Sequence, residues 1–106
     1  MVFVETSLFS RLLGSYLSDD EYRRLQNHLI EHPDAGAVIR NSGGVRKVRW
    51  RAGGKGKSGG VRVIYYWAKA DDQTFFLTLY DKGEKENLSA TDLKRVVKLL
   101  EELAND

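Results

Sequence analysis

The middle of the chain concentrates side chains that can hold and act on an anion. Nine Lys or Arg residues and no Asp or Glu occur between Ala35 and Ala70. They are Arg40, Arg46, Lys47, Arg49, Arg51, Lys55, Lys57, Arg62 and Lys69. The rest of the chain holds all 15 acidic residues, so the net charge is only +2. Such a patch attracts an oppositely charged partner, which would be nucleic acid, an anionic membrane or an acidic protein. The plain alternative is a solvated basic hairpin without a function.

The residue types limit the available chemistry. The absence of cysteine excludes disulfides, zinc–thiolate sites, iron–sulfur clusters and a cysteine nucleophile. The two histidines, His28 and His32, lie outside the cationic segment, and the carboxylates fall in expected helices and turns, so no metal site is predicted. Lys, Arg and Tyr would therefore carry any catalysis. RNA makes this feasible because its 2′-hydroxyl is a nucleophile, which leaves alignment, charge neutralisation and proton transfer to the protein. We expect no cofactor.

A glycine-rich segment, residues 53–60, superficially resembles a phosphate-binding loop at Gly56-Lys57-Ser58. The motif requires a glycine five positions before Gly56, where Arg51 stands, and a helix afterwards, where a strand is expected. Nucleotide hydrolysis is therefore excluded. The segment is either a flexible hairpin tip or a basic arm that orders on a phosphate backbone.

The spacing of apolar residues predicts one α+β domain over residues 1–106. We expect a strand at 2–4, a helix at 8–16, and a second helix that begins at a Ser18–Glu21 capping box and ends before Pro33. Strands follow at roughly 45–51, 61–68 and 74–80, and a last helix runs from about Ser89 to Leu103. The order is β-α-α-β-β-β-α, with a mainly antiparallel sheet and the helices packed on one face.

The alternation of side chains along each strand predicts two unlike sheet faces. One face is almost wholly apolar and should lie under the helices. The other mixes cations and rings, and it must meet water or an anionic ligand because burying unpaired cations is prohibitive. Basic residues interleaved with aromatics suit RNA, although aromatics are also common in strands generally. The predicted RNA contacts are Lys47, Arg49, Arg51, Tyr66 and Phe76.

No targeting or membrane segment is expected. No apolar run approaches the ~18 residues that cross a bilayer, and the N-terminus lacks a basic region with a cleavage pattern. A cytoplasmic protein without a membrane partner is the default expectation.

Three segments together resemble one protein family. Residues 43–49 (GGVRKVR), 55–66 (KGKSGGVRVIYY) and 77–85 (LTLYDKGEK) are similar to the RelE/HigB toxins of bacterial type II toxin–antitoxin systems, and most similar to the HigB branch. The resemblance implies a small α+β fold of the microbial-RNase type. It also implies entry into the ribosomal A site on the 30S subunit and metal-independent cleavage of the mRNA there by 2′-hydroxyl attack. The expected partners are the ribosome, mRNA and a HigA-like antitoxin with a helix-turn-helix domain.

The resemblance carries over to individual residues unevenly. Arg62 matches the strand arginine of the family, and Lys82 matches the basic residue after the last strand. The basic pair on the preceding strand matches either Arg49 and Arg51 or Lys55 and Lys57. The tyrosine that follows the last strand in RelE has no counterpart, so Tyr80 or Tyr66 would take its role. The catalytic candidates are therefore Arg62, Lys57, Lys55, Tyr80 and Lys82.

Two other functions remain open at this point. One is a ParE-like toxin that inhibits DNA gyrase from a related scaffold, and the other is an RNA-binding protein without catalysis. The long cationic segment weighs against the gyrase inhibitor.

Overall fold

A computed structural model describes residues 1–52 and 60–104. Lys55 and Lys57, and with them the predicted glycine-rich arm, lie outside the described residues. The elements are β1 (Val2–Glu5), α1 (Ser7–Tyr16), α2 (Asp19–Glu31), β2 (Ala37–Val38), β3 (Arg46–Trp50), β4 (Val61–Ala68), a single 3-10 turn (Lys69–Asp71), β5 (Gln73–Asp81) and α3 (Ala90–Ala104). The strands form one sheet in the order β1-β5-β4-β3-β2. All neighbouring strands are antiparallel except β1 and β5, so the predicted α+β class with a mainly antiparallel sheet is confirmed.

Local signals in the sequence set the helix ends. Ser18 and Glu21 form the predicted capping box at the start of α2, with each side chain accepting a hydrogen bond from the other residue's backbone N–H. Thr6 caps α1 and also donates from its hydroxyl to the Leu77 carbonyl, which ties the start of α1 to β5. The short edge strand β2 was not predicted, because two exposed residues give no periodic pattern.

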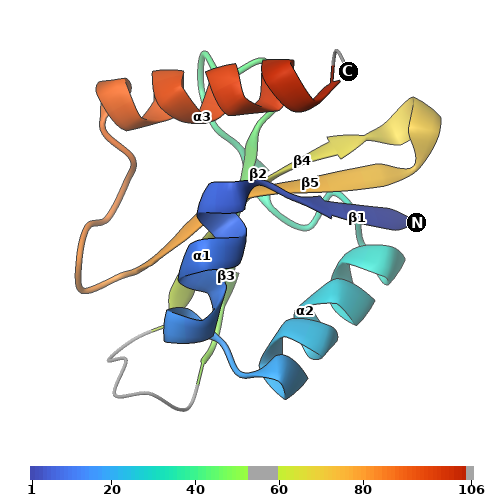
Figure 1. The fold of residues 1–106 in the computed structure, drawn as a ribbon, viewed down its shortest axis with the longest axis vertical. Helices are drawn as coiled ribbons and strands as arrows, with labels where there is room; N and C mark the ends of the chain where they lie inside the picture. Colours follow the sequence, from blue (N-terminus) through green and yellow to red (C-terminus); the bar gives the residue numbers. More distant parts are fainter. Residues whose placement is uncertain (53–59, 105–106) are drawn as a thin grey trace.

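Helices cover both faces of the sheet, which corrects the expectation that they share one face. Tyr65 of β4 packs in a cluster with Phe9 of α1 and Leu25 of α2. Its neighbour Ile64, on the opposite face of the strand, packs in a second cluster with Val96 of α3. In Figure 1, α3 runs along the top of the view, and α1 and α2 lie below it. The sheet face that was predicted to mix cations and rings also carries apolar residues, and α3 packs on these. The cations are therefore confined to the part of this face that α3 leaves uncovered.

An extra residue in β5 shifts the alternation of its side chains. Ile64 of β4 lies opposite Thr78, but the next residue, Tyr65, lies opposite Phe76, so Leu77 forms a bulge. The predicted strand pattern placed Phe76 and Tyr80 on one face. The bulge instead turns Phe76 into the cluster under α1 and α2, and it turns Tyr80 toward the α3 face.

Candidate RNA-binding and catalytic site

Three side chains form a row across the central strands on the α3 face of the sheet. Arg49 of β3 lies directly opposite Arg62 of β4, and Arg62 lies directly opposite Tyr80 of β5. Opposite residues in an antiparallel pair project from the same face, with Cβ atoms about 5 Å apart. The row therefore brings two guanidinium groups and a phenol together near the end of β3 and the start of β4.

The row borders an open depression that we call the cationic hollow. It has a volume of about 300 Å³ and is lined by Lys47, Arg49, Arg62, Lys82, Glu86 and Asn87. A second depression, of about 330 Å³, continues from it along Arg49, Arg51 and Gly60. Neither is covered by a helix of the described chain, so an extended anionic ligand can reach both.

The cations of the hollow form no ion pair with a carboxylate of the described residues. Within residues 1–52 and 60–104, the ion pairs join the N-terminus to Asp72, Arg24 to Asp20 and Lys85 to Asp92, and none involves Arg49 or Arg62. Arg62 is only 9% exposed. Like charges placed directly opposite each other on a sheet are destabilising. A bound phosphate would relieve that repulsion, and arginine presents a planar fork that suits it.

The loop after β5 is held against the hollow by consecutive contacts. The Tyr80 hydroxyl donates to the Glu86 carbonyl at 3.4 Å, and Lys47 Nζ donates to Asn87 Oδ1 at 2.7 Å. Lys85 Nζ lies 5.3 Å from the centre of the Tyr80 ring and 3.3 Å from an Asp92 carboxylate oxygen at the start of α3. These contacts hold residues 85–87 at the rim of the hollow.

Tyr80 lies beneath the surface next to this site. Its side chain is 3% exposed, so it cannot stack on a base while the loop lies over it. Burial raises the pKa of Tyr80, and the nearby positive charge of Arg62 offsets part of that rise. A phenol that keeps its proton can donate a hydrogen bond but cannot act as a base.

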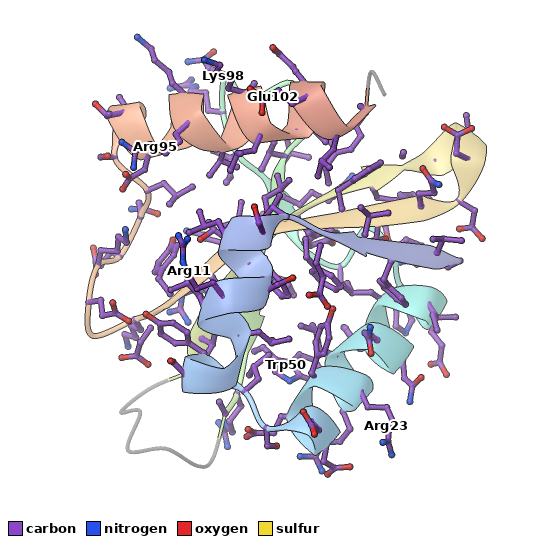
Figure 2. All side chains as sticks on the ribbon, viewed as in Figure 1. Arg11, Arg23, Trp50, Arg95, Lys98 and Glu102 are labelled. Carbon is purple, nitrogen blue, oxygen red and sulfur yellow. The ribbon has the colours of Figure 1, made fainter. Side chains whose placement is uncertain are left out.

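The structure brings together most of the predicted cationic residues. Arg62, Arg49, Lys47 and Lys82 line the hollow, and Arg51 is exposed in the adjoining depression. The Trp50 side chain packs against the cluster under α1 and α2, with its ring centre 5.4 Å from that of His28. In Figure 2 it lies between these two helices.

Two predicted stacking residues lie elsewhere. Phe76 is fully buried, with its ring centre 4.9 Å from that of Phe9 and 5.5 Å from that of Phe3, so the prediction that it contacts RNA is wrong. The bulge at Leu77 is the cause. Tyr66 stands four residues beyond Arg62 on β4, or about 13 Å along the strand. There it packs in the α3 cluster and lines a different depression with Phe75, so the structure does not bring it to the hollow.

Two lining residues were missed by the sequence analysis. Glu86 and Asn87 lie in the loop after β5, where no periodicity or motif marks them. They reach the hollow because the loop turns back toward β3, where Asn87 accepts a hydrogen bond from Lys47. Among the described residues, no group of three or more His, Asp or Glu is placed to hold a metal ion. In the same part of the chain, none of the helices is long and apolar enough to span a bilayer.

The fold and the hollow together define a small α+β protein with an open cationic site of a size and charge suited to a phosphate backbone. Residues 15–105 match the model of the RelE family, described as the RelE toxin of the RelE/RelB toxin–antitoxin system, and the chain belongs to this family. Membership implies an antitoxin as partner. The fold is similar to that of a double arginine-to-alanine mutant of the Escherichia coli toxin RelE in its free state. The TM-score is 0.53 at 15% sequence identity, over 80% of this chain and 86% of that chain.

Proposed function

We propose that this toxin is a ribosome-dependent endoribonuclease that cleaves mRNA in the A site of the 30S subunit without a metal ion. The observation that carries the proposal is the pairing of Arg49 with Arg62 in an open hollow, with no neutralising carboxylate in ion-pair contact among the described residues. Membership of the RelE family supports the same function.

The proposed reaction uses the RNA's own 2′-hydroxyl. Its oxygen attacks the adjacent phosphorus, and the bond from phosphorus to the 5′-oxygen breaks, which leaves a 2′,3′-cyclic phosphate and a 5′-hydroxyl. Arg62 and Arg49 would bind the non-bridging oxygens and stabilise the extra negative charge of the pentacoordinate transition state. Lys82 would donate a proton to the leaving oxygen. Arg51 would hold the next phosphate along the strand, and Lys55 and Lys57 stay candidates outside the described residues.

The proposed partner is a HigA-like antitoxin with a helix-turn-helix domain, and we assign the chain to the HigB-like branch. The support is the resemblance of residues 55–66 to the hairpin of that branch. Co-purification of the toxin with the product of the adjacent gene tests this assignment. A partner without a helix-turn-helix domain would contradict it.

Cell-free translation with primer-extension mapping tests the proposed function. The purified protein should stop translation and create new mRNA 5′ ends at A-site codons, and Arg62→Ala should create none. RNA binding with a steep salt dependence but no new ends would indicate a non-catalytic RNA-binding protein. Damage to DNA with translation intact would instead indicate a gyrase inhibitor.

A further inference from the structure

We propose that the Glu86 carboxylate is the group that accepts the proton of the attacking 2′-hydroxyl. This inference rests on the RNA-cleaving function proposed above and assigns a role that the proposal leaves open. Nothing in the sequence marks Glu86, and the structure places it among the residues that line the cationic hollow together with Arg62.

The other described residues that line the hollow are poor proton acceptors. An arginine guanidinium stays protonated in proteins, and a lysine ammonium has no lone pair until it loses a proton. The amide of Asn87 is not basic. Tyr80, just behind the wall, keeps its proton because burial raises its pKa. A carboxylate is an acceptor in its ordinary charged form, and Glu86 is the one carboxylate among the described lining residues.

The backbone around Glu86 is fixed although its side chain is exposed. The Glu86 carbonyl accepts the Tyr80 hydroxyl, and the residues on either side are held by their own contacts, Lys85 to Asp92 and Asn87 to Lys47. The Glu86 carboxylate makes no ion pair with another described residue. A group anchored through its backbone and without an ion pair at its carboxylate is accessible to a substrate oxygen.

The 2′-oxygen gives its proton to the Glu86 carboxylate as it bonds to phosphorus, and the 5′-oxygen leaves with the electron pair of the broken bond and takes a proton from the Lys82 ammonium. Glu86 then holds one added proton and Lys82 has lost one. Exchange with water restores both groups after the cyclic phosphate and the 5′-hydroxyl have left.

The charge of Glu86 has a second, opposing effect. A carboxylate near Arg49 and Arg62 repels the incoming phosphate, so its removal should not weaken substrate binding. Loss of the proton acceptor should therefore lower the rate of the chemical step while affinity stays equal or increases. A residue with a purely structural role would not produce this separation of rate from affinity.

Single-turnover cleavage of ribosome-bound mRNA tests the inference with Glu86→Gln, which keeps the shape and removes the base. The rate should fall by about 10²–10⁴-fold with binding retained, and the rise of rate on the acid side of the pH profile should disappear. Glu86→Asp should keep that rise at an intermediate rate. Glu102→Gln, on α3 (Figure 2), is the matched control and should cleave as wild type.

The outcomes separate this inference from the proposed function. If the wild type cleaves no mRNA on ribosomes, the proposed function fails. If the wild type cleaves, Arg62→Ala does not, and Glu86→Gln keeps the wild-type rate and pH profile, the role of Glu86 alone is overturned. Thermal melting accompanies each variant. Should Glu86→Gln be unfolded, the Glu86→Asp profile decides, because a rate without an acid-side rise in that variant also overturns the inference.

Discussion

Arg49 and Arg62 lie directly opposite each other on neighbouring antiparallel strands, on the same face of the sheet, and neither forms an ion pair with a described carboxylate. Such a pair costs stability in the free protein. The destabilising pair lies beside an open depression that an anion can enter, which is the pattern expected where binding rather than stability determines the residues.

Removal of one arginine of this pair should increase the stability of the fold and weaken RNA binding. Arg49→Ala should raise the free energy of unfolding at low salt by up to about 0.5 kcal/mol. The same variant should bind single-stranded RNA more weakly and lower the salt slope of log K by about 0.7, the share of one phosphate contact. Arg23→Ala on α2 is the control, with no change in either quantity. Chemical denaturation and RNA titration at several salt concentrations measure both, and an unchanged slope would remove Arg49 from the interface.

Arg62→Ala should strongly lower the cleavage rate while the fold persists. The loss of one transition-state donor costs about 10²–10³-fold in rate. Arg62→Lys keeps the charge but loses the planar fork, so it should recover only part of the rate. Quantified new 5′ ends in cell-free translation measure the rates, and circular dichroism confirms the fold. Recovery of the full rate by lysine would show that charge alone, without the fork, is sufficient.

Phe76→Ala should act on stability rather than on RNA. The ring is buried among Phe3, Phe9 and Tyr22, so its truncation should cost about 3–5 kcal/mol. Phe76→Leu fills more of the space and should cost less. Urea denaturation gives the two free energies. For molecules that remain folded, RNA affinity should equal that of the wild type, and a selective loss of affinity would restore Phe76 as a contact.

Tyr16 should make the fold sensitive to high pH. Burial, together with the hydrogen bond to Glu84 (2.6 Å) and the charge of that carboxylate, raises the pKa of Tyr16 from 10.0 to about 12. The unfolded chain therefore releases this proton at lower pH than the folded chain. The contribution of Tyr16 to stability is complete below pH 10 and falls as the pH rises toward 12.

Tyr16→Phe removes that contribution and the hydrogen bond. At neutral pH the variant should be less stable by about 2 kcal/mol, the usual value for a hydrogen bond to a charged group. The difference from wild type should shrink as the pH rises through the same window. Tyr22, whose pKa is also raised by burial and Glu5, remains in both proteins and cancels in the comparison. A difference that stays constant with pH would contradict the assignment.

The sequence predicted the elements well because their signals are local. The capping box at Ser18 and Glu21 lies within four residues, and the alternation along β4 correctly placed Arg62 and Ile64 on one face. The bulge at Leu77 could not be predicted, since nothing in residues 75–80 distinguishes a regular strand from one that skips a partner. That single missed residue explains why Phe76 was assigned to the wrong face.

The site was predicted in part for the same reason. Lys47, Arg49, Arg62 and Lys82 are marked by charge and by strand position, and the structure brings them together. Glu86 and Asn87 join them through the path of a loop, which depends on tertiary contacts such as the hydrogen bond from Tyr80. Because Glu86 lies outside the cationic segment, nothing in the sequence predicts that it reaches the hollow.

The Leu77 bulge has a consequence for how such a toxin can be inactivated. Because the bulge sets which way Tyr80 turns, insertion of one codon between Thr78 and Tyr80 would point the ring under α1 and withdraw the support beneath residues 85–87. A deletion that removes Leu77 itself would leave a regular strand with Tyr80 still beside Arg62. The effect of a one-residue insertion or deletion in β5 on the direction of Tyr80 should therefore depend on whether the change falls at the bulge or after it.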